Sequence, residues 1–340
     1  MATTVKRGHI ALAVVCGLAA VAYLALRDIN SLSFSGLHFT AHTIAGLLLA
    51  VALFAGQNLC LMWRYHHLAC GSISWRQAFR VDALCEFTSA VTPSAVGGSS
   101  LIFWFLHREG MSAGRSTAVM MSTLMMDELF LTLGCVAVLA MIPAHVLFGD
   151  AQVVNAGVQW LFIGVLVAVA AWTAVLYVAL FHRPQWVGRV LLAIFSLPVL
   201  RRWRPSIEAV SHDICVSSES MRRHGFWFWL KTFGITVGAW SCRYAVVNAV
   251  LMAFTSGGDH LLAFARQFVL WIVAMISPTP GGSGLNEYMF SVYYSDFTPD
   301  AGTTLVAVLA WRLITYYSYL VVGAFVIPSW FSGSTEKAEA

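Results

Sequence analysis

Charged side chains stand inside long apolar segments of this sequence, and they are the residues best suited to do chemistry there. They are Glu86, Asp127, Glu128, Arg243, Arg266, Glu287 and Arg312. A charge in hydrocarbon is costly, so such a residue usually faces a cavity or an oppositely charged partner. Guanidinium groups pair with phosphate through two hydrogen bonds, so we interpret the arginines as binders of an anionic group and the carboxylates as groups that hold them. A desolvated carboxylate could also carry a proton, and structural salt bridges are the alternative for each residue.

Two turns rich in proline and glycine interrupt apolar segments of the chain. The candidate site residues in these turns are Pro93, Gly97 and Gly98 in the first, and Pro278, Pro280, Gly281, Gly282 and Ser283 in the second. Proline removes a backbone donor and glycine loosens a helix, so both stretches should be unwound. Unwound backbone at membrane depth is tolerated only inside protein or beside a wet cavity. We therefore expect the two turns to form the resting place of a substrate; simple kinks in packed helices are the alternative.

The elements that must position these residues are membrane spans. The 340-residue chain is 59% hydrophobic and only 11% charged, whereas about a quarter of the residues of a soluble domain are charged. Six apolar segments approach or exceed the roughly 20 residues that cross a hydrocarbon core as a helix. These segments are residues 9–26, 43–63, 117–142, 158–181, 226–254 and 303–327. The sequence thus predicts an all-α integral membrane protein with a single polytopic domain over residues 1–340.

The distribution of arginine predicts how the spans are oriented. Arg64, Arg76, Arg80, Arg108 and Arg115 fall between the second and third predicted spans, and seven more arginines lie between residues 183 and 223. Residues 143–159 contain no Lys or Arg. By the positive-inside rule both arginine-rich loops, and with them both termini, lie in the cytoplasm. We expect residues 182–224 to run along the cytoplasmic interface, and the basic loops give no reason to expect a nucleic-acid partner.

The two interrupted segments, residues 81–106 and 261–294, are better explained as re-entrant helical hairpins than as spans. If the first crossed the membrane, every later loop would change sides and the seven-arginine loop would lie outside. Three predicted spans separate the two segments, so the second hairpin should enter from the opposite side. The fold class expected is six transmembrane helices plus two oppositely oriented re-entrant hairpins, an inverted repeat.

Enzyme motifs receive weaker support from the sequence. Residues 281–284 contain the GxSG string of rhomboid-type proteases, but no histidine follows His260 to act as the base that a serine nucleophile needs. No phosphate-binding loop of an ATP-driven motor is present. The pair His66–His67 lacks further ligands at metal spacing, so we expect neither a metal nor a cofactor. A transporter is favoured, and a membrane-embedded lipid-modifying transferase and a purely structural partner protein remain the alternatives.

The second turn carries the most specific resemblance. Residues 278–287 read Pro-Thr-Pro-Gly-Gly-Ser-Gly-Leu-Asn-Glu, which is similar to the PxPGGxGxxE signature of the lysylphosphatidylglycerol synthase transmembrane family, also called flippase-like. That family includes the membrane half of the multiple peptide resistance factor. Arg312 resembles the arginine in the family's last spans, and Pro93 with Gly97 and Gly98 resembles its first turn. The resemblance covers nearly the whole chain. Relatives often carry an arginine shortly before the acid that matches Asp127, where this chain has methionines.

The resemblance implies a lipid flippase or scramblase in a bacterial or archaeal cytoplasmic membrane. The cargo would be an anionic, aminoacylated or glycosylated lipid, and a homo-oligomer or a lipid-synthesis enzyme would be the further partner. Only about a dozen residues follow the last predicted span. The soluble aminoacyl-transferase domain of the full-length resistance factor is therefore not expected, nor is aminoacylation of lipid by this chain.

Overall fold

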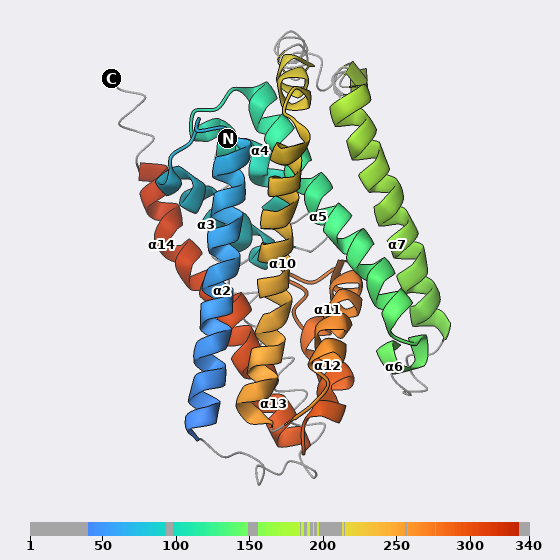
Figure 1. Cartoon of the computed structure of the whole chain (residues 1–340). Helices are drawn as coiled ribbons and strands as arrows, with labels where there is room; N and C mark the ends of the chain where they lie inside the picture. Colours follow the sequence, from blue (N-terminus) through green and yellow to red (C-terminus); the bar gives the residue numbers. More distant parts are fainter. Residues whose placement is uncertain are drawn as a thin grey trace.

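The computed structural model describes residues 40–92, 98–148, 156–183, 215–255, 257–275 and 277–332, together with isolated positions between 185 and 213 (Figure 1). Regular structure within these ranges is helical. The long helices are α2 (Ala41–Leu68), α5 (Ala113–Met141), α7 (Ala156–Tyr177) and α10 (Phe226–Phe254). A further helix is continuous from α13 (Ala301–Arg312) through the π-helical turn η6 (Leu313–Tyr317) into α14 (Ser318–Ser332).

Five segments of the described structure are long and apolar enough to cross a membrane. They are Ala41–Leu68, Ala113–Met141, Gln159–His182, Phe226–Phe254 and Ala301–Val326. The third of these segments contains α7, which ends in a second π-helical turn, η3 (Val178–His182). These segments coincide with five of the six predicted spans. The remaining one, the first predicted span at residues 9–26, lies outside the described residues. The prediction of an all-α membrane protein is confirmed at this level.

Helices α2 and α10 pack against each other along their length and run antiparallel. A Cβ atom on Gly46, near the start of α2, would lie 2.7 Å from the Cα of Ala253, near the end of α10. Further along, a Cβ atom on Gly56 would lie at an ordinary contact distance, 3.5 Å, from Cys242 Sγ of α10. Small residues at these positions let the two backbones approach closely, as is common between membrane helices. The pair gives the molecule two distinct ends, one at Leu68 and the other at Phe254.

The first interrupted segment has two helical limbs, and its base lies at the Leu68 end. Its limbs are α3 (Trp75–Val91) and η1 (Gly98–Leu101) followed by α4 (Ile102–Arg108). The base is closed by an ion pair in which Arg80 Nε donates to Glu109 at 2.8 Å. Gly98 packs tightly on α3, because a Cβ there would lie 1.9 Å from the carbonyl oxygen of Cys85. Residues 93–97, including Pro93 and Gly97, lie outside the described residues.

The second interrupted segment forms a helix–turn–helix whose base lies at the opposite, Phe254 end. Its limbs are α11 (His260–Met275) and α12 (Leu285–Tyr294), and η5 (Ser295–Phe297) follows. Asn248 near the end of α10 donates to the His260 carbonyl at 2.7 Å, which fixes the start of α11. Gln267 and the Tyr294 hydroxyl are hydrogen bonded at 2.6 Å and hold the two limbs together. Figure 1 accordingly places α4 toward the upper end and α11 and α12 in the lower half.

The buried core divides in the same way. One apolar cluster, which includes Tyr244, Phe268 and Phe290, surrounds α11 and α12. Another, which includes Leu84 and Phe105, packs between α3, α4 and their neighbours. The short helix α6 (Ala144–Phe148) follows α5 and lies within the predicted loop, residues 143–159. Most of the predicted interfacial segment, residues 182–224, lies outside the described residues.

Candidate functional site

The two interrupted segments, entering from opposite ends, touch at the centre of the molecule. The backbone N–H of Gly281 donates to the carbonyl of Thr92, the residue that ends α3, at 3.1 Å. Gly281 has φ of +56°, and a Cβ there would lie 2.3 Å from the ring of Tyr316. The position therefore requires glycine both for its backbone conformation and for the close approach. The Tyr316 hydroxyl bridges the segments, since it donates to the Ala90 carbonyl at 3.3 Å and accepts from Ser283 Oγ at 3.1 Å.

A cavity of about 290 Å³ lies beside the contact between the two interrupted segments. This is just below the roughly 300–1,000 Å³ typical of small-molecule pockets, so the cavity has room for a small polar group. Its polar lining includes Gln57, Arg64, Glu86, Ser89, Asp127, Arg243, Gln267, Asn286 and Arg312. Its aromatic lining comprises Tyr65, Trp240, Tyr244, Trp271, Trp311, Tyr316 and Tyr319. The cavity thus combines charged groups with aromatic faces.

Arg243, on α10, is held at the cavity by an acid and by aromatic rings. Its Nη2 donates to Glu86 Oε2 on α3 at 2.7 Å. The guanidinium carbon lies 5.2 Å from the ring centroid of Trp240 and 5.3 Å from that of Trp271, within reach of cation–π attraction. With its amide oxygen turned toward Arg243, Gln57 accepts from Arg243 Nε at 3.1 Å. The single bond to Glu86 leaves other N–H donors of this guanidinium for a ligand.

Asp127, on α5, pairs with an arginine that was expected elsewhere. Arg64 was predicted to lie in the cytoplasmic loop, but α2 continues through it to Leu68 and its side chain is only 2% exposed. Arg64 Nη1 donates to Asp127 Oδ1, and Nη2 donates to Oδ2 at 3.1 Å, a two-bond pairing. Trp240 Nε1 also donates to Asp127, at 2.7 Å. The cationic partner of Asp127 therefore comes from another helix rather than from the preceding turn of α5.

Among the described residues, Arg312 and Glu287 form the most deeply buried ion pair, with side chains 4% and 1% exposed and a distance of 2.8 Å between Nε and Oε1. The second carboxylate oxygen of Glu287 accepts from the N–H of Gly284 at 2.7 Å. A carboxylate in the first turn of α12 is also favoured by the helix dipole. Arg312 directly precedes η6, a π-helical turn of a kind often found at functional sites. Glu287 thus ties the second turn to the π-helical turn beside the cavity.

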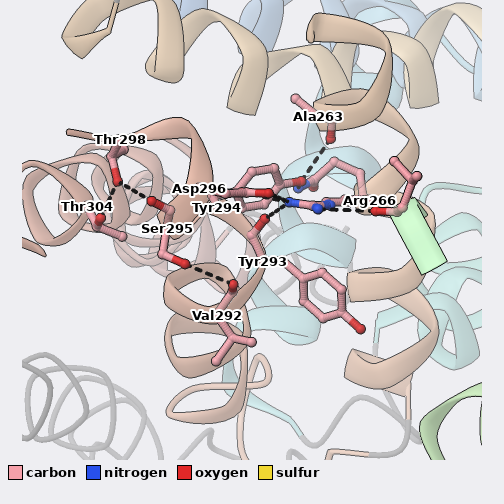
Figure 2. A network of polar contacts seen from close by, with 11 residues as sticks. Ala263, Arg266, Val292, Tyr293, Tyr294, Ser295, Asp296, Thr298 and Thr304 are labelled. Carbon is pink, nitrogen blue, oxygen red and sulfur yellow. Dashed lines mark hydrogen bonds and ion pairs between the residues drawn. The ribbon is translucent and has the colours of Figure 1, made fainter. Parts of the chain in front are cut away.

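Arg266 lies outside the cavity lining, at the base of the second helix–turn–helix. Figure 2 shows its guanidinium facing Asp296 and the backbone of Tyr293. Arg266 donates to both carboxylate oxygens of Asp296 at 2.8 Å and to the Val146 carbonyl at 3.2 Å. These contacts fasten the base of the helix pair to the α6 region. The structure therefore does not bring Arg266 together with Arg243 and Arg312.

The remaining predicted residues divide between the cavity and its frame. Gly281 lines the cavity, whereas Pro278, Pro280, Gly282 and Ser283 build the turn behind it. Glu128 is not part of the lining and makes no side-chain hydrogen bond or ion pair to the part of the chain that the structure describes. Within that part, no group of three or more His, Cys, Asp or Glu side chains is arranged to hold a metal ion.

The formal charges around the cavity balance. The lining contributes the arginines Arg64, Arg243 and Arg312 and the acids Glu86 and Asp127. Glu287, paired to Arg312, supplies the third acid, so three positive and three negative charges sum to zero. Paired charges of this kind are what a purely structural role would also need. Their position around a cavity, with N–H donors left over on Arg243, would also allow them to bind a polar ligand.

Two comparisons with known proteins extend over most of the chain. The family model for the lysylphosphatidylglycerol synthase TM region matches residues 9–323. The chain is 24% identical over 296 residues to a UPF0104 membrane protein of Archaeoglobus fulgidus, a match covering 83% of this chain and 86% of that protein. The family match takes in every residue that lines the cavity. The chain therefore belongs to the lysylphosphatidylglycerol synthase transmembrane-region family.

Proposed function

We propose that this protein moves a membrane lipid between leaflets, as a flippase or scramblase for an anionic, aminoacylated or glycosylated headgroup. The observation that carries the proposal is the cavity between two helix pairs whose bases lie at opposite ends of the molecule. Three arginines line this cavity. The family name refers to the synthesis of an aminoacylated phospholipid, which connects the family with membrane lipids.

The proposal includes two re-entrant hairpins among six spans. With a rise of 1.5 Å per residue, α3 (17 residues) is about 26 Å long and α11 (16 residues) about 24 Å, while the hydrocarbon core is about 30 Å thick. The returning limbs are shorter still, because η1 and α4 have 4 and 7 residues and α12 has 10. Limbs of these lengths that meet tip to tip fit entry from opposite sides. The arginine-rich Leu68 end would be cytoplasmic, with both termini on that side.

In the proposed mechanism the acids around the cavity hold the arginines when no lipid is bound. A headgroup phosphate would compete with Glu86 for Arg243, to which that acid is joined by one hydrogen bond. Aromatic faces such as Trp240 and Trp271 would pack against the apolar or sugar part of the headgroup. The acyl chains would remain in the bilayer, since the cavity has room for a headgroup alone.

The test is reconstitution of the purified protein into liposomes that contain fluorescent phospholipid and glycolipid analogues. A membrane-impermeant quencher follows leaflet exchange, and mass spectrometry follows the lipids themselves. Exchange faster than in protein-free liposomes, with unchanged lipid mass, supports the proposal. A lipid product of altered mass without exchange would instead identify a lipid-modifying transferase. If there were neither exchange nor a modified lipid, a structural partner protein would be the better explanation.

A further inference from the structure

Asp82 on α3 is a buried acid that no arginine holds. Asp82 is only 3% exposed, and its Oδ1 has no hydrogen-bond partner in the part of the chain that the structure describes. It forms no ion pair with the described residues, in contrast to Glu86, Asp127 and Glu287, each of which is paired with an arginine. An ionised carboxylate buried without a partner is so costly that the group takes up a proton instead. The geometry therefore favours a neutral, protonated Asp82.

Asp82 nevertheless stands close to the charged groups of the cavity. Glu86 follows it by one helical turn on α3, so the two side chains project from the same face of that helix. The titratable or charged groups that interact with it electrostatically are Arg64 and Tyr65 on α2, Cys85 and Glu86 on α3, Arg243 on α10 and Tyr319 on α14. Loss of the proton would place a second negative charge on α3 beside the arginines that line the cavity.

We propose that Asp82 is a proton-binding site that couples proton movement to lipid transport through the cavity, an inference that rests on the proposed function. With Asp82 protonated, Arg243 and Arg64 are attracted only by Glu86 and Asp127 and can also hold an anionic headgroup. When Asp82 loses its proton, its carboxylate competes with the headgroup for these arginines and favours release of the lipid. The proton and the lipid bind together and leave together, one proton for each lipid, which is symport.

Symport makes a quantitative prediction for liposomes with a pH gradient. One proton per lipid links the leaflet distribution to the gradient, and each pH unit is worth a factor of about ten at equilibrium. With the membrane potential clamped at zero and a gradient of about one unit, an anionic fluorescent phospholipid should approach a tenfold excess in the leaflet on the alkaline side.

The variants to compare are Asp82→Asn, which is a neutral isostere of the protonated acid, and Glu219→Gln as a matched control. Glu219 forms a surface ion pair and its side chain is 45% exposed, so unlike Asp82 it is neither buried nor without a charged partner. Asp82→Asn should still exchange lipid but distribute it equally, whereas Glu219→Gln should behave like the wild-type protein. Equal distribution in a wild-type protein that exchanges lipid, or a gradient response retained by Asp82→Asn, would overturn the coupling. Absence of exchange in the wild type would instead overturn the proposed function and the coupling with it.

Infrared difference spectroscopy tests the site without relying on transport or on the variant's activity. Wild-type protein with isotope-labelled aspartate should show a carboxylic-acid C=O stretching band at neutral pH, and Asp82→Asn should lack it. Because the acid is already neutral, the thermal midpoint of Asp82→Asn should match that of the wild type. A spectrum with no protonated aspartate band would refute the assignment of Asp82 as a proton site.

Discussion

Removing one partner of the Arg312–Glu287 ion pair should destabilise the protein strongly. Both side chains are almost fully buried, at 4% and 1% exposed, so either single substitution leaves an uncompensated charge. Breaking a buried pair in this way costs about 3–5 kcal/mol. Glu287→Ala also removes the acceptor of the Gly284 N–H, and the loss of such a hydrogen bond adds about 1 kcal/mol. We therefore expect Glu287→Ala to be at least as destabilising as Arg312→Ala.

The double variant Glu287→Ala/Arg312→Ala discriminates this explanation from a simple loss of packing. Once both charges are gone no buried charge is left unpaired, so the double variant should cost clearly less than the sum of the single variants. Thermal unfolding in detergent measures the shifts, and at about 2 °C per kcal/mol for a large domain the single variants should lose about 6 °C or more.

The exposed pair Arg222–Glu219, with side chains 56% and 45% exposed, provides the control. Surface pairs contribute about 0–1 kcal/mol, so Arg222→Ala should shift the midpoint by about 2 °C at most. Additive costs in the double variant, or single variants no more destabilised than Arg222→Ala, would refute the buried-pair explanation.

Three further predictions follow from close packing and from one partly buried acid. Gly46→Ala should destabilise by about 1–3 kcal/mol, because its Cβ would lie 2.7 Å from a backbone atom of α10; thermal unfolding checks this. Gly281→Ala forces a side chain onto a φ of +56°, which alone costs about 1–2 kcal/mol, whereas Gly164→Ala, with nothing within 4 Å, serves as the control. Burial raises the pKa of the Glu109 carboxyl, but hydrogen bonds, chiefly from Arg80, lower it by more, to below its usual value. A carboxyl with a lowered pKa stabilises the fold at pH above its unfolded-state pKa, and this stabilisation is lost as the pH falls through its folded-state pKa. The thermal unfolding midpoint, measured from roughly pH 5 to 3, should therefore fall less steeply in Glu109→Gln than in the wild type.

Local sequence features predicted the elements of the fold well. Uninterrupted apolar runs predicted five segments that the structure also has as long apolar helices, since a span needs only length and hydropathy. Proline and glycine predicted both interruptions, and the turn around Gly281 has the positive φ that glycine supplies. The ion pairs at the base of each interrupted segment, such as Arg80 with Glu109, could not be predicted, because which residues face each other there depends on the length of the returning limb.

Contacts between distant helices were beyond the reach of sequence patterns. Arg64 follows Trp63 at the end of an apolar run, which is typical of an interfacial loop, yet α2 continues and buries the side chain against Asp127. Arg266 shares charge and setting with Arg243, but the fold pairs it with Asp296, which no sequence signal singled out. The π-helical turn after Arg312 likewise has no signal in the composition of the sequence around it.

The measurement that bears on lipid movement through the central cavity is the initial rate of leaflet exchange in liposomes for two matched arginine variants. Arg243→Gln and Arg266→Gln make the same substitution and each breaks one ion pair, but only Arg243 lines the cavity. With both variants folded and reconstituted equally, Arg243→Gln should lose most of the exchange that exceeds protein-free liposomes, and Arg266→Gln should retain it. Equal rates for Arg243→Gln and the wild type would contradict a lipid path through this cavity.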